Sequence, residues 1–147
     1  MRERMNDTKN EWQVVVNPEV GEIQELRRQL ANFNTSHAEM NGVGLGIFKR
    51  DSENTLKAGI YGWLWGACLE IDYLWVDGGL RGQGIGRRLL QNLEKEAISR
   101  SARVAVLDTF DWQASLFYQK YGYEIFGTIE GYGKDHKKYF MRRDLTQ

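Results

Sequence analysis

Apolar and polar residues alternate along the chain with two periods, which predict strands and helices in succession. Residues 12–16 form a short run rich in β-branched side chains, and Asn17-Pro18 ends it. The next apolar residues recur at helical spacing: Ile23, Leu26, Leu30 and Phe33. Residues 44–49 and 56–65 then indicate two strands joined by a polar turn. The first half of the chain therefore predicts a strand, an amphipathic helix and a hairpin.

The second half of the chain continues this mixture of elements. Residues 69–76 predict a fourth strand, whose alternation places four side chains on one face: Glu70, Asp72, Leu74 and Val76. A Gly-rich turn leads into a helix marked by one apolar stripe: Ile85, Leu89, Leu93 and Ala97. A strand over residues 103–109, a short helix over 113–121 that Gly122 ends, and closing strands over 123–129 and 139–145 complete the pattern.

The predicted order of elements is β-α-β-β-β-α-β-α-β-β, which is typical of a mixed α/β (α+β) fold. No internal repeat, low-complexity tract or Pro/Ser-rich linker interrupts it. We therefore expect one domain over residues 1–147, with a mostly antiparallel sheet flanked by helices. A domain of this length buries about 68–70% of its unfolded surface and needs no disulfide to hold a core.

Composition and charge exclude several kinds of partner. The 147 residues carry 20 Lys and Arg against 20 Asp and Glu, so no global field attracts nucleic acid or an anionic membrane. A single cysteine, Cys68, and two histidines leave little capacity for a metal site, and we expect none. Residues 1–7 lack the apolar segment of a secretory signal, and the uncharged stretch over 58–69 is too short to span a membrane. A cytoplasmic protein is expected.

The loop over residues 81–86 carries the strongest chemical signal. Its sequence is Arg81-Gly82-Gln83-Gly84-Ile85-Gly86, and it leads directly into the predicted helix. A helix start presents unpaired backbone N–H groups and partial positive charge, and glycines let a phosphate approach them. The spacing lacks the Lys-Ser/Thr pair of a P-loop and differs from the dinucleotide fingerprint G-x-G-x-x-G. A plain glycine-rich turn is the alternative interpretation.

Two segments together resemble the acetyl-coenzyme A-binding region of the GNAT superfamily of N-acetyltransferases. The first runs from the strand end Leu74-Trp75-Val76 through the loop to residues 87–90, RRLL. The second is residues 111–123, DWQASLFYQKYGY, which is similar to the family pattern N-x-x-A-x-x-(L/F)-Y-x-K-x-G-(F/Y). The resemblance covers residues 69–127, whereas the residues before 69 match only in the order of elements. It implies the acyl-CoA N-acyltransferase fold.

The resemblance also implies how acetyl-coenzyme A, the acetyl donor, is bound. The backbone amides from Gln83 to Arg87 would hold its pyrophosphate, and the strand end would bind its pantetheine arm as an added strand does. The implied binding residues are Leu74, Trp75, Val76, Arg81, Gly82, Gln83, Gly84, Ile85, Gly86, Arg87 and Asp111. Asp111 stands where the family often has an asparagine that contacts the cofactor, and its alternative role is to cap the next helix.

The implied reaction is transfer of the acetyl group from the thioester to an amine. Tyr118 matches the family's general acid, which protonates the departing thiolate, whereas the pattern without the motif favours a core tyrosine there. In the family the fourth strand bulges, and a backbone N–H near Leu74 polarises the acetyl carbonyl. Glu70 and Asp72 are the candidates for the base. Their alternative roles are to recognise a cationic amine or to face solvent.

We therefore expect an N-acetyltransferase whose acceptor is a small-molecule or peptide amine of unknown identity. The competing hypothesis is a noncatalytic module on the same fold that serves for coenzyme A binding or for interaction. Trp63 and Trp65 share a strand face, and such aromatic residues together with the closing strands suggest a homodimer. His136 lies in a predicted loop over residues 131–138 that could border the acceptor pocket.

Overall fold

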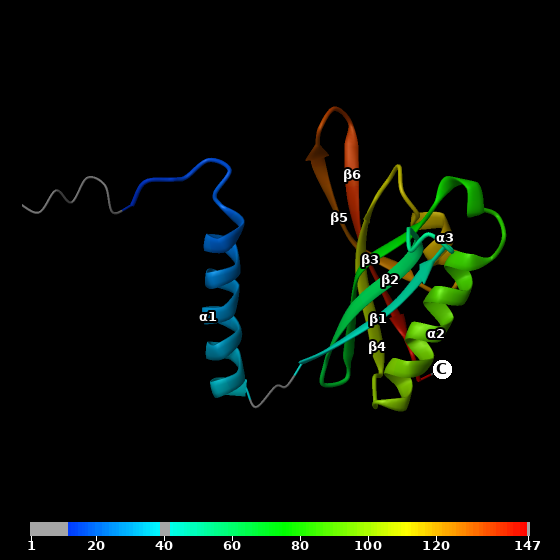
Figure 1. Cartoon of the computed structure of the whole chain (residues 1–147), viewed down its shortest axis with the longest axis horizontal. Coiled ribbons are helices and arrows are strands. Elements are labelled where there is room, and N and C mark those ends of the chain that lie inside the picture. Colours follow the sequence, from blue (N-terminus) through cyan, green and yellow to red (C-terminus); the bar gives the residue numbers. More distant parts are fainter. Residues whose placement is uncertain (1–11, 39–41, 147) are drawn as a thin grey trace, which may run out of the picture. The chain divides into compact units, whose positions relative to one another are not determined.

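The computed structural model describes residues 12–38 and 42–146 (Figure 1). The chain divides into two compact units, Met1–Glu39 and Met40–Gln147. The first contains α1 (Val20–Ala38), which confirms the predicted amphipathic helix. Residues 1–7, which carry the expectation about a secretory signal, lie outside the described ranges. Throughout those ranges, no helix combines the length and hydrophobicity that crossing a membrane requires.

The strand predicted over residues 12–16 is wrong. These residues form no regular element, and the side chains of Trp12, Val14 and Val16 are exposed. β-branched residues favour a strand only where a neighbouring strand satisfies its hydrogen bonds and covers one of its faces. None of the described strand ladders includes this segment.

The second unit is built on one six-stranded sheet with the order β1-β2-β3-β4-β6-β5. Its strands are β1 (Gly42–Arg50), β2 (Leu56–Trp65), β3 (Cys68–Val76), β4 (Val104–Phe110), β5 (Glu124–Tyr132) and β6 (His136–Asp144). All neighbouring strands are antiparallel except β3 and β4, which run parallel. The mixed, mostly antiparallel sheet expected from the sequence is confirmed. The β5–β6 hairpin is longer than predicted, so His136 begins a strand and does not lie in a loop.

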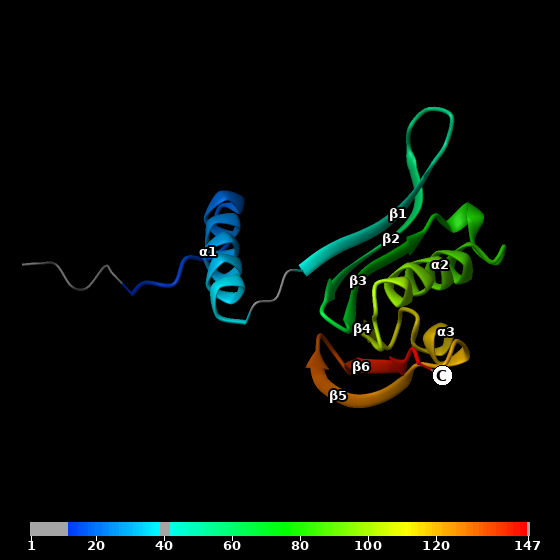
Figure 2. The same cartoon turned by 90° about the horizontal axis from the view of Figure 1, so that it is seen from below.

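Two helices and a short 3-10 turn complete this unit: η1 (Gly78–Leu80), α2 (Ile85–Ser99) and α3 (Ser115–Lys120). Figure 2 shows α2 lying along one face of β1, β2 and β3. The apolar stripe of α2 is buried there, and Ile60 and Leu64 of β2 belong to the same core. Side chains alternate along a strand, so Tyr61 and Trp63 point to the opposite face, which we call the outer face.

A bulge changes the facing of the side chains along β3. The β2–β3 register pairs Gly62 with Ile71 and Tyr61 with Tyr73, so Asp72 is an extra residue. Glu70 pairs with Trp63 on the outer face, whereas Leu74 pairs with the buried Ile60. The prediction that Glu70 shares a face with Leu74 and Val76 is therefore wrong, because uninterrupted alternation does not hold across a bulge.

A buried network anchors α2 to the end of the sheet. Glu94 of α2 is only 4% exposed, and the hydroxyl of Tyr123 donates a 2.8 Å hydrogen bond to its carboxylate. The guanidinium of Arg143 on β6 forms an ion pair with the same group. Burial, followed by the charge of Glu94, raises the pKa of Tyr123. Since α2 begins at the glycine-rich loop, this network helps to fix the position of that loop.

Replacing Tyr123 with phenylalanine should test the network. The ring packing remains, but the buried carboxylate of Glu94 loses one donor, which costs about 2 kcal/mol of unfolding free energy. Urea denaturation at neutral pH measures this cost. A Tyr123→Phe variant as stable as the wild type would show that Arg143 alone satisfies Glu94.

Candidate active site

The loop between β3 and α2 adopts the conformation that its glycines permit. Gly82 and Gly84 have φ values of 75° and 76°, and Gly84 is the N-cap of α2. At neither position does any atom lie within 4 Å of where a Cβ would stand. The side chain of Arg81 folds back and donates a 3.1 Å hydrogen bond to the carbonyl oxygen of Val76. The loop therefore presents bare backbone on its open side.

Backbone donors at the start of α2 are available to an anion. The amide of Arg88 donates to the carbonyl of Gly84 at 3.1 Å. The amides of residues 85–87 precede this bond and have no acceptor within the helix. Together with the helix dipole, these three amides form a site suited to a phosphate group.

A cavity of ≈ 740 Å³ extends from this loop toward α3. Its walls come from the end of β3, the loop, the start of α2, and α3. The sequence-predicted residues that line it are Leu74, Trp75, Val76, Arg81, Gly82, Gly84, Ile85, Gly86, Arg87 and Tyr118. Gln83 and Asp111 are absent from the lining. The cavity thus brings together nearly all the residues to which the sequence assigns coenzyme binding.

Several lining residues were missed by the sequence analysis: Leu80, Trp112, Gln113, Ala114, Phe117, Lys120 and Tyr121. A signal for some of them was present, because Ala114, Phe117 and Tyr121 lie on one side of a helix with Tyr118. Gly86 lets α3 pack closely against α2, because it has no side chain: a Cβ at this position would stand only 3.4 Å from the ring of Phe117.

Tyr118 is buried, yet its hydroxyl is available to the cavity. The residue is 6% exposed, and its ring packs edge-on against Phe117 and Tyr123. Among the described residues, no donor or acceptor forms a hydrogen bond with its hydroxyl. Burial raises the pKa of Tyr118 to about 12, so the hydroxyl keeps its proton at neutral pH. The phenol is therefore present as a donor.

β3 and β4 separate next to this cavity. Their parallel ladder consists of three pairs and ends at Glu70 and Val106. Beyond that point β3 remains paired only with β2, and β4 only with β6. The second half of β3 therefore turns a free edge toward the gap between the two strands, and Leu74 lies on this edge.

A second cavity, of ≈ 330 Å³, lies where the two strands separate. Its lining residues are Glu70, Ile71, Asp72, Val106, Leu107, Asp108, Phe126 and Phe140. The register places Glu70 on the outer face with Trp63, and Asp108 directly opposite Phe140. Both candidates for the base, Glu70 and Asp72, thus line a cavity different from the one that Tyr118 lines. We call it the outer cavity.

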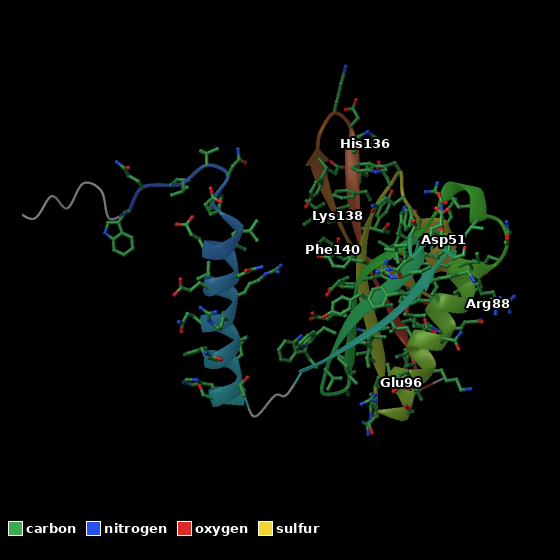
Figure 3. All side chains as sticks on the ribbon, in the orientation of Figure 1. Asp51, Arg88, Glu96, His136, Lys138 and Phe140 are labelled. Atoms are coloured by element: carbon green, nitrogen blue, oxygen red, sulfur yellow. The ribbon has the colours of Figure 1, made fainter. Side chains whose placement is uncertain are left out.

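Asp111 lies outside the lining of the larger cavity and makes its hydrogen bonds with the start of β6. Its carboxylate lies 3.1 Å from Nδ1 of His136 and accepts a 3.2 Å hydrogen bond from the amide of Lys137. The His136 ring also packs edge-on against Trp112. Figure 3 shows His136, Lys138 and Phe140 in succession along β6. Asp111 therefore secures the start of β6, and no capping bond from it to α3 is present.

Metal ligands are not grouped in the part of the chain that the structure describes. Within residues 12–38 and 42–146, no set of three or more His, Cys, Asp or Glu side chains could hold a metal ion. The linings of the two cavities offer backbone amides, the phenols of Tyr118 and Tyr121, and the carboxylates of Glu70, Asp72 and Asp108.

Comparison with known proteins agrees with this geometry. The family model of the acetyltransferase (GNAT) domain matches residues 38–125. The chain is 34% identical over 94 residues to the blasticidin-S acetyltransferase of Streptomyces morookaense, covering 61% of this chain and 67% of that protein. It is 30% identical over 105 residues to an acetyltransferase of Agrobacterium fabrum, covering 71% and 77% respectively.

A solved structure extends the similarity to the fold. The crystal structure of an acetyltransferase from Bacillus cereus superposes with a TM-score of 0.71 at 28% identity, covering 90% of this chain and 97% of that one. The family match includes β3, the glycine-rich loop, α2 and α3, which together form the larger cavity. The chain therefore belongs to the GNAT family of acetyltransferases, and it is an acetyl-coenzyme A-dependent N-acetyltransferase.

Proposed function

We propose that the two cavities hold the two substrates of one acetyl transfer, with acetyl-coenzyme A in the larger cavity and the amine in the outer cavity. The observation that carries this proposal is the separation of β3 from β4. β3 contributes Leu74 to Val76 to one cavity and Glu70 to Asp72 to the other. A thioester bound along the free edge of β3 would thus meet an amine that enters from the outer face.

The residues of the larger cavity fit the donor. The open glycines and the amides at the start of α2 suit its pyrophosphate. The free edge of β3 offers backbone groups to which a pantetheine amide can bind in the manner of an added strand. Gln83 contributes only its backbone here, and its side chain lies near the carbonyl oxygen of Gly79 at 3.5 Å.

In the reaction, the amine nitrogen bonds to the thioester carbon and the carbon–sulfur bond breaks. Tyr118 donates its hydroxyl proton, or a hydrogen bond, to the departing thiolate. Glu70 accepts the proton that the amine loses, directly or through water, and Asp72 is the second candidate for this step. The backbone near the β3 bulge is suited to polarise the carbonyl.

Release of coenzyme A tests the proposal. The purified chain is incubated with acetyl-coenzyme A and a panel of amines that includes blasticidin S, polyamines, amino acids and a short peptide. We expect thiol release that depends on an amine and a product that is heavier by one acetyl group in mass spectrometry. Binding of acetyl-coenzyme A without turnover of any amine would instead support the noncatalytic module.

The protein's assembly and location belong to the same proposal. We place it in the cytoplasm as a homodimer that acts on a small-molecule or peptide amine without nucleic acid or membrane. The zero net charge and the single cysteine support this. Trp63 and Trp65, which pack together on the outer face with ring centroids 5.6 Å apart, support the dimer. Light scattering at micromolar concentration decides between monomer and dimer.

A further inference from the structure

The outer cavity has an uneven balance of charge. Its lining includes three carboxylates, those of Glu70, Asp72 and Asp108, and no basic residue. Lys138 reaches the carboxylate of Asp108 at 3.4 Å from outside the lining. The Nζ atom of Lys138 is held over the rings of Phe110 and Tyr132, 4.8 and 5.1 Å from their centroids. All the ionisable side chains of the lining itself are therefore acidic.

Two phenylalanines, Phe126 and Phe140, form part of the wall of the outer cavity. Phe126 sits at an irregularity of β5, between Ile125 and Gly127, and remains 60% exposed. Its ring centroid lies 6.4 Å from that of Phe140. An exposed phenylalanine beside carboxylates is a surface that a flat cation can cover, because such a group stacks on the ring while its charge faces the carboxylates.

The acceptor amine must be neutral to react, so the positive charge that the outer cavity recognises cannot be the charge of that amine alone. Carboxylates near an amine favour its protonated form, which has no lone pair to attack a thioester. If the reacting amine were the only charge bound, the site would stabilise the unreactive state. A second group that stays charged resolves this conflict, since it can satisfy the carboxylates while the amine gives up its proton.

We propose that the acceptor carries, besides its primary amine, a second, planar and permanently charged group such as a guanidinium, which binds against Phe126 and Phe140 near Asp108. This inference rests on the proposed function and names the substrate class of its outer cavity. Glu70 is left to serve the reacting amine, because it lies at the last pair of the β3–β4 ladder, next to the gap.

Three amines on similar carbon chains test the proposal: 4-aminobutylguanidine, pentylamine and 5-aminopentanoate. The second group is cationic in the first amine, absent in the second and anionic in the third. We expect kcat/KM to fall by about 10-fold or more from each amine to the next in this order. The difference in kcat/KM between 4-aminobutylguanidine and pentylamine should become smaller in high salt.

Variants of the outer cavity and matched control variants show which residues cause the preference for the guanidinium-bearing amine. Asp108→Asn and Phe126→Ala should each reduce the preference for 4-aminobutylguanidine over pentylamine to about 3-fold or less. Glu96→Gln is the control for the charge, because Glu96 is also half-exposed and ion-paired, 50% exposed against 52% for Asp108. Figure 3 shows that Glu96 lies on α2, well apart from Lys138 and Phe140.

Phe48→Ala is the control for the loss of an exposed aromatic ring, since Phe48 is 61% exposed on β1. Both controls should keep the preference.

Failure of this inference differs from failure of the proposed function. Acetylation of all three amines at similar kcat/KM would overturn the inference and leave the function intact. If no amine releases coenzyme A, the function fails. Calorimetry with pentylguanidine and the protein saturated with coenzyme A then decides the inference. Binding that Asp108→Asn weakens supports it, and absence of binding overturns it.

Discussion

Replacing Gly84 with valine should weaken the binding of acetyl-coenzyme A by about 30-fold or more, which corresponds to about 2 kcal/mol. Gly84 is the N-cap of α2 with φ of 76°, a conformation that a β-branched residue strongly disfavours. Its missing side chain also leaves open the path by which a phosphate reaches the amides of residues 85–87. The substitution therefore disturbs the conformation of the loop and covers its donors at the same time.

A second glycine substitution separates the effect of backbone strain on stability from the effect of Gly84→Val on donor binding. Gly66 in the turn between β2 and β3 has φ of 54° and, like Gly84, no atom within 4 Å of a Cβ position. Gly66→Val and Gly84→Val should each lower the unfolding free energy by about 1–3 kcal/mol, because both place a β-branched residue at positive φ. Only Gly84→Val should also weaken the binding of acetyl-coenzyme A. Calorimetric titration of both variants gives the comparison. Unchanged affinity in a folded Gly84→Val variant would remove the loop from the binding site.

Most of the residues that the sequence analysis assigned to the donor line one cavity, whereas most residues of the outer cavity received no role from the sequence. The glycines and the helical spacing after them determine the geometry of the loop and of the start of α2 locally, and Tyr118 was assigned through the family resemblance of residues 111–123. Phe126 and Phe140, by contrast, approach Glu70 only because β6 lies between β4 and β5 in the sheet. That pairing joins residues far apart in the chain, and no local pattern indicates it.

Two errors at the level of elements have the same physical origin. Residues 12–16 have the composition of a strand, but strand formation depends on a partner that the local sequence does not specify. The alternation along β3 failed because one extra residue, Asp72, reverses the facing of everything after it. Periodicity predicts which way a side chain points only while the ladder stays regular.

Replacing Tyr118 with phenylalanine should lower kcat by about 10- to 100-fold while the affinity for acetyl-coenzyme A changes little. The ring keeps its contacts with Phe117 and Tyr123, so only the hydroxyl is lost. Burial raises the pKa of Tyr118 to about 12, above the roughly 8.5 of an ordinary thiol, so complete proton transfer to the thiolate is uphill. The hydroxyl then acts mainly as a hydrogen-bond donor, which places the effect at the lower end of general acid catalysis.

The pH dependence of turnover distinguishes the phenol from the carboxylate. The wild-type kcat should rise as the acceptor amine loses its proton and should not fall through ionisation of Tyr118 up to about pH 10, because its pKa is about 12. Glu70→Gln should recover part of its activity at high pH, where the amine is already neutral, and Tyr118→Phe should not. Tyr123→Phe is the control for the loss of a buried hydroxyl outside both cavity linings: it should lower the stability of the fold but keep the wild-type pH profile of kcat. A Tyr118→Phe enzyme with wild-type kcat, when chemistry limits the rate, would leave Tyr118 as a core residue.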